Sequence, residues 1–331
     1  MPPAPSPMVR RRRLGAELRR LREIAGLTGD QVIARVGWAS ASKLSRLENG
    51  RSRPDLSDVL DLLDLYEVTG DTREELIGIT RDAGNTRGWL RSYPVMTQRQ
   101  RSYAELEAGC AEIFEYGPVI LPGLLQTPGY TRVRLLSSRE VIVPEDAEDP
   151  ETEIAARVAR QSTLTREAEP PRYEAVLEVA ALGGRGGPAP VMATQLRHLA
   201  RLAELPNVTL WVLPPSAKVA DWYLPETSFS IYRFADPDDP DAVAVESLAA
   251  DLILTEDDML ARYGRVFDWL RQAARPPAES LTWITEAAAA LGPPSGDDAD
   301  SPPSPPLTPP VQRRRRTQQR PPQRTNAPPD R

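Results

Sequence analysis

Residues 41–53 carry the side chains whose types and spacing suit hydrogen bonding to nucleic-acid base edges. On a helical wheel of about 100° per residue starting at Ala41, Leu44 and Leu47 share one side. The opposite side carries the polar side chains of Ser42, Ser45, Arg46 and Asn49, and Ala41 begins the helix beside them. A face of this kind is small and polar enough to seat against base edges in the major groove of DNA.

Four of these residues are predicted to read bases. Arg46 can make a bidentate contact to guanine O6 and N7, which discriminates between bases by about 1–3 kcal/mol. Ser42 and Ser45 can donate or accept a hydrogen bond and therefore specify weakly, whereas the Ala41 methyl group can contact a thymine methyl group. We therefore expect most of the discrimination to come from Arg46.

Five further residues are predicted to contact phosphates, and such contacts position a protein on DNA without reading its sequence. They are Thr28, Lys43, Asn49, Arg51 and Arg53. Lys43 lies to the side of the polar face, and Asn49, Arg51 and Arg53 lie at or just past the end of the predicted helix.

Local signals predict five short helices over residues 14–84, two of which would form a helix-turn-helix. Leu14, Leu18 and Leu21 repeat on one helical face, which Gly26 ends. The other helices should begin at cap residues, namely Thr28 with Gln31, Ser40, Asp55, and Thr72 with Glu75. The turn 37–40 joins the second and third helices, so the third helix would enter the groove.

The run SKLSRLENGRSRP, preceded by GLTGDQVIARVGW, resembles the Cro/C1-type (XRE family) helix-turn-helix of phage repressors and many bacterial regulators. The resemblance implies a lambda-repressor-like fold in which Ala41, Ser42 and Arg46 face bases and Asn49 contacts a phosphate. It gives Glu48 a structural role. It also implies that the protein binds two-fold DNA sites as a homodimer.

A second resemblance covers most of the remaining chain. The runs YAELEAGCAEIFEYGPVILPGLLQTPGY, VARQSTL and PNVTLWVLP resemble the conserved C-terminal domain of actinobacterial, WhiJ-like regulators. The two resemblances imply a transcriptional regulator linked to development or secondary metabolism, often encoded beside a small partner protein. Two features depart from the pattern: Gly29 replaces the usual Gln, and the turn GWASAS is one residue longer.

The predicted fold class is therefore multidomain, with four parts. A disordered basic arm (1–13) precedes the all-α five-helix, lambda-repressor-like DNA-binding domain (14–84), an α+β domain (89–290) and a disordered Pro/Arg-rich tail (293–331). Alternating or β-branched segments predict strands at 173–179, 208–213, 227–234 and 242–247. Apolar periodicity predicts helices at 99–116, 130–138, 151–168, 191–205, 256–274 and 279–290.

Charge is segregated along the chain, although the total is only −6. Residues 1–54 hold 12 basic and 4 acidic residues, whereas residues 89–292 hold 19 basic and 30 acidic residues. A basic end on an acidic body suggests that a polyanion binds at that end. The alternative is that Arg10–Arg13 serve only as a solubilising tail.

Composition excludes several other classes of function. A single cysteine, Cys110, and a single histidine, His198, exclude a disulfide scaffold, a Cys/His zinc site and any catalytic dyad that would need a second histidine. GGRGGP at 183–188 lacks the pattern of a phosphate-binding loop. We predict no enzyme activity and no cofactor. No apolar run approaches the ~20 residues of a membrane span and no secretory signal is visible, so we expect a cytoplasmic, nucleoid-associated protein.

The α+β domain is expected to dimerise, to sense a small-molecule effector or to dock the partner protein. An antitoxin-like protein that neutralises a partner and autoregulates through DNA binding is the alternative. Cys110 and the segment LPGLLQTPGY are interpreted as core, with a ligand or partner groove as the alternative for the segment. The tryptophans expected in the core or a pocket wall are Trp211, Trp222, Trp269 and Trp283. The acidic loop 236–241 is expected in solvent, and RRRR at 313–316 as an auxiliary electrostatic anchor.

Overall fold

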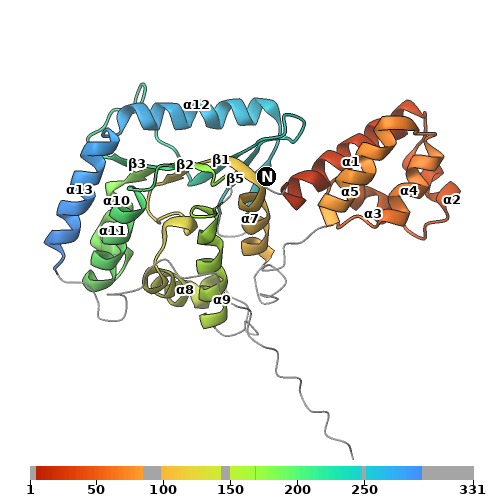
Figure 1. Cartoon of the computed structure of the whole chain (residues 1–331). Helices are drawn as coiled ribbons and strands as arrows, with labels where there is room; N and C mark the ends of the chain where they lie inside the picture. The colour runs from red at the N-terminus through yellow and green to blue at the C-terminus, as the bar shows by residue number, and fades with distance from the viewer. Residues whose placement is uncertain (1–4, 85–97, 143–149, 168, 248–250, 293–331) are drawn as a thin grey trace, which may run out of the picture.

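A computed structural model describes residues 5–84, 98–142, 150–167, 169–247 and 251–292 of the chain. It contains a helical domain at the N-terminus and a larger sheet domain built from the residues after 97 (Figure 1). The multidomain prediction, an all-α domain followed by a mixed α and β domain, is confirmed. No helix among the described residues is both long and apolar enough to cross a lipid bilayer.

Five helices form the helical domain around one apolar core. They are α1 (Pro7–Ile24), α2 (Gly29–Val36), α3 (Ala41–Glu48), α4 (Leu56–Leu65) and α5 (Gly70–Gly84). Leu14 and Leu18 of α1 are fully buried against side chains of the other helices, among them Val32, Val59 and Leu62. The predicted periodicity of the first helix thus identified the face that enters the core.

Side-chain caps start three of these helices where the sequence predicted them. Thr28 and Gln31 form the capping box of α2, Ser40 caps α3, and Asp55 caps α4. The predicted capping box at Thr72 was wrong, because α5 begins two residues earlier at Gly70. Gly70 has a φ of 66°, a conformation that glycine adopts without the strain a side chain would bring.

The predicted disordered arm over residues 1–13 was wrong for residues 7–13, which form the first two turns of α1. Ser6 caps the helix, since its Oγ accepts a hydrogen bond from the Val9 N–H at 3.4 Å, and Pro7 occupies the first turn. Val9 is 1% exposed and packs into the core of the sheet domain. The segment is helical because the sheet domain buries one side of it.

The sheet domain holds one mixed six-stranded sheet in the order β3-β2-β1-β4-β5-β6. Its strands are β1 (Cys110–Gly117), β2 (Arg172–Glu178), β3 (Val208–Leu213), β4 (Phe229–Phe234), β5 (Ala242–Val245) and β6 (Leu252–Leu254). β1, β2 and β3 are parallel, and β4, β5 and β6 continue the sheet with antiparallel pairs. The four predicted strands are all present, whereas β1 and the three-residue β6 were not predicted.

The predicted helix 99–116 was wrong in its second half. Helix α7 (Gln98–Gly109) ends at Gly109, and β1 begins at the next residue. Ile113 and Phe114 fit helical spacing, but in the strand they enter two different cores on opposite sides of the sheet. A strand buried on both faces carries apolar residues at spacings that also fit a helix, so the spacing could not distinguish a helix from a strand here.

Helices cover both faces of the sheet (Figure 1). One face packs against α12 (Asp257–Ala273) through Phe267 and Leu270. The other face carries the remaining larger helices, namely α7, α8 (Pro128–Ile142), α9 (Pro150–Arg160), α11 (Ala189–Leu202) and α13 (Pro277–Ala290), with the short α10 (Val179–Leu182) between β2 and α11. The segment LPGLLQTPGY belongs to this second core, because Leu121, Leu124, Leu125 and Tyr130 are all buried there.

Candidate nucleic-acid interface

Helix α3 presents the polar face that the sequence predicted. Leu44 and Leu47 are 3% and 5% exposed and anchor the helix in the core of the helical domain. The other side of the helix lies at the surface, where Ala41, Ser42, Ser45, Arg46 and Asn49 are all exposed. The division of α3 into a buried and an exposed face is confirmed, and the base contacts themselves stay predictions.

Both ends of α3 are fixed by hydrogen bonds. The Ser40 Oγ accepts from the Ser42 N–H at 3.2 Å and lies 2.8 Å from the Ser42 Oγ. At the other end the Asn49 Nδ2 donates to the Ser45 carbonyl at 2.6 Å. The backbone then turns at Gly50, whose φ of 62° brings it against α1. The exposed face is therefore held in one orientation relative to the domain.

The predicted phosphate contacts differ in how free their side chains are. Arg51 and Arg53 are exposed, and within the described part of the chain their guanidinium groups have no hydrogen-bond or ion-pair partner, as is true of Arg46. Lys43 instead pairs with Asp58 at 2.5 Å and lies 4.4 Å from the centre of the Trp38 ring. A phosphate would have to compete with both of these contacts for Lys43.

Thr28 lies at the exposed start of α2, where its Oγ1 accepts from the Gln31 N–H at 3.3 Å and its own N–H donates to the Gln31 side chain at 2.9 Å. This reciprocal capping occupies the hydroxyl oxygen. Its hydroxyl proton is left for an outside acceptor, which is consistent with the predicted phosphate contact.

A shallow groove runs between α1, the start of α2 and α3, and the sequence did not point to two of its residues. Arg19 and Arg22 of α1 line it together with Ala41, Ser45 and Asn49. Arg19 donates to the Asn49 Oδ1 at 3.0 Å. Arg19 belongs to a different helix from α3, and only the packing of α1 on α3 brings the two together, so no local pattern could have identified it.

Glu48 lines this groove and fixes the position of Arg22. Its carboxylate is almost fully buried and accepts from the Arg22 Nε at 2.6 Å and from the Arg22 Nη2 at 3.1 Å. The hydrogen bond to Glu48 raises the pKa of Arg22, so the guanidinium group keeps its charge and its pairing. This geometry agrees with the structural role that the family resemblance implies for Glu48.

The basic run Arg10–Arg13 lies at the junction between the two domains, not in a free arm. The Ser6 Oγ donates to the Glu105 carbonyl at 2.8 Å, and a Cβ on Gly109 would lie 2.2 Å from the Ser6 nitrogen. Arg11 pairs with Glu105, and Arg12 donates to the Ile253 carbonyl at 3.0 Å. The start of α1 is thus packed directly on the sheet domain.

Arg10 and Arg13 are held by the loop between β4 and β5. Asp236 accepts from Arg10 at 2.9 Å and from Arg13 at 3.1 Å, and Asp239 lies within 3.4 Å of both arginines. The side chain of Asp239 is only 2% exposed. The prediction that this acidic loop is solvated was therefore wrong for Asp236 and Asp239, whose carboxylates neutralise the basic run, whereas Asp238 is exposed as predicted.

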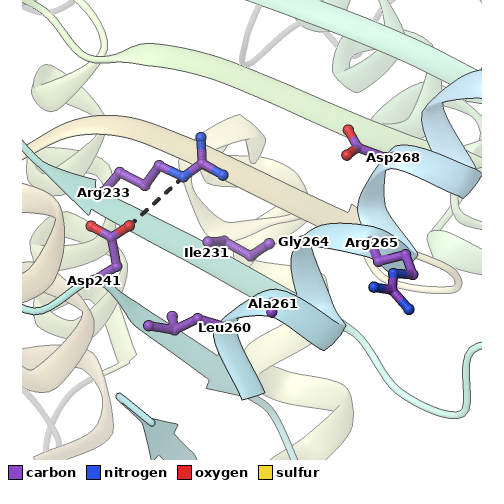
Figure 2. Close-up of a pocket in the computed structure, with 8 residues that line it drawn as sticks. All are labelled: Ile231, Arg233, Asp241, Leu260, Ala261, Gly264, Arg265 and Asp268. Atoms are coloured by element: carbon purple, nitrogen blue, oxygen red, sulfur yellow. Dashed lines mark ion pairs between the residues drawn. The ribbon is translucent and has the colours of Figure 1, made fainter. Parts of the chain in front are cut away.

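An open cavity of about 420 Å³ lies between α12 and the β4–β5 edge of the sheet domain (Figure 2). Arg233 and Asp241 form its sheet side and face each other at 3.8 Å, while Arg265 and Asp268 come from α12. Arg233 and Asp241 are also the residues that flank the loop holding Arg10 and Arg13. A ligand there would contact the base of that loop.

The interior of the sheet domain contains buried polar side chains. Glu115 of β1 accepts hydrogen bonds from the Tyr173 hydroxyl and, at 2.9 Å, from the Ser230 hydroxyl. Burial raises the pKa of Glu115 to about 7, so this carboxyl group titrates near neutrality. Nearby, Arg160 forms a bidentate pair with Glu107 at 2.9 and 2.5 Å. These groups are packed and bonded, and they define no open site.

The two lone residues of reactive type have structural surroundings. Cys110 is fully buried, and burial raises the pKa of its thiol, so it is a core residue as predicted. His198 is half-buried, and burial lowers its pKa to about 4, which keeps the imidazole neutral. Trp222, expected in the core or a pocket wall, is instead 75% exposed.

Comparison with known proteins matches both domains to families. Residues 100–286, more than half of the chain, match the family described as Domain of unknown function (DUF5753), and residues 13–76 match the family described as Helix-turn-helix domain. The chain belongs to the first family and carries a helix-turn-helix domain at its N-terminus. That domain indicates DNA binding, and with it transcription regulation. No curated protein and no solved structure matches the chain.

Proposed function

We propose that the protein is a sequence-specific transcriptional regulator of the Cro/C1 type that inserts α3 into the major groove of DNA. The observation that carries the proposal is the exposed polar face of α3, fixed by Leu44 and Leu47 beneath it and by bonded caps at both ends. Arg46 lies on that face without a partner among the described residues. A guanidinium group left free at the surface is available to a guanine.

The neighbouring residues divide into base readers and backbone contacts. Ala41, Ser42 and Ser45 share the face with Arg46 and would meet adjacent base edges. Thr28, Asn49, Arg51 and Arg53 are all exposed and would contact phosphates, with Arg19 supporting Asn49. Lys43 would contribute less, because Asp58 and Trp38 already hold it.

The sheet domain is proposed to set the orientation of α3 through α1. The first turn of this helix places Val9 in the core of the sheet domain, and later turns place Leu14 and Leu18 in the core of the helical domain. One helix shared by two cores transmits the position of one domain to the other. In a homodimer on a two-fold site, this coupling would fix the distance between the two α3 helices.

Effector sensing is the role of the sheet domain that the geometry favours. The cavity of Figure 2 is lined by Arg233 and Asp241, which flank the loop that binds Arg10 and Arg13. A small molecule that drew either residue out of its pair would shift this loop and, through it, α1. Docking of a small partner protein, with or without antitoxin-like neutralisation, is the alternative, and co-purification with the product of a neighbouring gene tests it.

Selection of bound sequences from a random duplex pool tests the main proposal. The wild-type protein should enrich a two-fold site, and Arg46→Ala should lose preference at one base pair of each half-site, a penalty of about 1–3 kcal/mol. The matched control is Arg20→Ala, which removes another exposed arginine of the helical domain, one that is paired with Glu17 at 2.5 Å. An unchanged site preference for Arg46→Ala would remove Arg46 from the base-reading face.

A further inference from the structure

Three consecutive large apolar side chains are exposed on the loop between β3 and β4. Trp222 is 75% exposed, Leu224 is 82% exposed and Tyr223 is 40% exposed. We call residues 219–226 the aromatic loop. Exposed apolar side chains that adjoin one another mark binding surfaces more often than scattered ones do.

The structure holds the aromatic loop in this outward position. Val219 anchors it in the core beside α12, and the Tyr223 ring packs edge-on against the Trp269 ring at 5.6 Å. Ala220 and Trp222 have φ values of 43° and 65°, which residues other than glycine rarely adopt. Strain of this kind persists where the surroundings impose it, and it clusters at functional positions.

The aromatic loop and the helical domain lie at opposite ends of the strands of the sheet. The loop follows β3, at the end of the sheet where the parallel strands β1–β3 end. Helix α1 packs at the other end, where β1 begins, beside Gly109 and Asp236. Eight residues of β1 separate these ends by about 26 Å. Figure 1 shows the helical domain beyond the end where β1 begins.

This position argues against a second copy of the chain as the occupant. A two-fold axis through the aromatic loop would place the two helical domains at the far ends of the pair, although neighbouring half-sites lie only about 34 Å apart. The exposed apolar area is on the order of 400 Å², about half of the roughly 800 Å² that each partner buries in a stable interface. The loop instead suits a short peptide.

The chain itself contains a peptide of suitable chemistry. Residues 301–316 read SPPSPPLTPPVQRRRR, and no acidic residue occurs between Asp300 and Asp330. Proline-rich segments favour the extended polyproline II conformation, which docks on exposed aromatic rings at low entropic cost. Glu226 and Glu246 are exposed at the same end of the strands as the loop, so their charge complements the arginines, whereas Asp221 already pairs with Lys218 at 3.2 Å.

The tail begins close enough to reach the loop. The Gly292 carbonyl accepts from the Arg197 side chain at 2.7 Å, which fixes the end of the described chain beside α11. Helix α11 has 14 residues, a length of about 21 Å. It starts at the same end of the strands as the aromatic loop but covers the opposite face of the sheet, so the tail must also pass around the sheet. The ten residues from Gly292 to Pro302 can span up to about 33 Å.

We propose that the aromatic loop, through Trp222, Tyr223 and Leu224, binds the proline-rich segment 302–310 of the same chain, with Arg313–Arg316 paired to the acidic residues at that end of the strands. The tail is then an internal ligand of the sheet domain. It covers an apolar surface that would otherwise be exposed, and a partner with a similar proline-rich, basic segment would have to displace it.

Bimane fluorescence in the full chain tests the contact, because a nearby tryptophan quenches this dye. Cys110 is fully buried, so Thr308→Cys supplies the accessible thiol for labelling. The labelled protein should be at least twofold dimmer than the same protein carrying Trp222→Leu, and replacing Arg313–Arg316 by Gln should restore part of the emission. A label at Asp298→Cys, ahead of the proline segment, is the matched control and should respond little to Trp222→Leu.

Two outcomes would overturn the proposal. One is equal emission with and without Trp222. The other is quenching that grows with protein concentration, or that appears on mixing labelled Trp222→Leu chains with unlabelled chains, because the occupant would then be a second copy. As a check that needs no change in the loop, serine at Pro305, Pro306, Pro309 and Pro310 should speed hydrogen exchange in the aromatic loop, whereas unchanged exchange contradicts the contact.

Discussion

Two arginine-bearing regions of this protein differ in the surroundings that the fold gives them. Arg10–Arg13 at the start of α1 are bound by carboxylates and carbonyl groups of the sheet domain. Arg46, Arg51 and Arg53, in and just after α3, are exposed and have no partner in the described part of the chain. The density of positive charge favours the first region as a DNA contact, yet the second is the one left free to make it.

The comparison shows that a basic run is available to DNA only when carboxylates of the protein itself are not already paired with it. Asp236 and Asp239 lie more than 220 residues beyond Arg10 and Arg13 in the chain, and the fold brings them together. Charges that are already paired release few counter-ions when DNA binds, so they add little affinity.

The largest expected effect comes from separating the first region from the sheet domain. Gly109→Val should cost about 3 kcal/mol or more in the free energy of unfolding, because even a Cβ at this position would lie 2.2 Å from the Ser6 nitrogen. Thermal unfolding followed by circular dichroism measures it. Gly78→Ala is the control, since nothing lies within 4 Å of that Cβ, and this helical substitution should stabilise the protein by up to about 1 kcal/mol.

The second largest effect is the pH dependence of stability that the buried Glu115 of the sheet domain should cause. The pKa of Glu115 is raised to about 7 by burial, so the folded state holds this proton more tightly than the unfolded state, whose pKa is near 4.5. Stability should therefore fall as pH rises from about 4.5 to 7, by on the order of 1–3 kcal/mol. Glu115→Gln should flatten this part of the pH profile, and an unchanged profile would contradict the assignment.

A crossed pair of double variants tests the comparison directly. Arg10→Ala with Arg13→Ala should lower stability by about 1–3 kcal/mol, because it leaves the buried Asp239 without its ion-pair partners. It should leave the salt dependence of DNA binding unchanged. Arg51→Ala with Arg53→Ala should keep stability and reduce the slope of log K against log salt by about 2. If the first pair reduced the slope instead, Arg10 and Arg13 would be phosphate contacts and the comparison would fail.

The smallest effect is expected at Lys43, which belongs to α3 but is already paired. Lys43→Ala should lower stability by no more than about 0.5 kcal/mol, the usual contribution of an exposed ion pair. It should weaken DNA binding less than Arg51→Ala does, as measured by fluorescence anisotropy at fixed salt. A larger loss of affinity than that of Arg51→Ala would place Lys43 among the main phosphate contacts.

The parts of the fold that the sequence predicted are those fixed by local rules. The caps at Thr28, Ser40 and Asp55 and the two faces of α3 depend on residues within one or two helical turns. The candidate base-reading face was therefore accessible to a helical wheel.

The parts that were missed depend on distant residues. The helical state of residues 7–13 requires acceptors from the sheet domain, and Arg19 joins the candidate site only because α1 packs on α3. Strand β1 needs apolar residues on both faces, which hides the twofold alternation of a strand. The exposure of Trp222 is set by a backbone conformation that no composition rule predicts.

Helix α1 also limits how the two halves of this protein can be exchanged. Met8 and Val9 precede the DNA-binding domain in the chain. Val9 nevertheless lies in the core of the C-terminal domain, and the partly buried Met8 packs against that core. A cut between residues 84 and 98 would give one fragment with bare apolar residues at its tip and another with a hole where Val9 had been. Exchange of the helical domain alone would therefore require a matching first turn to fill the place of Val9.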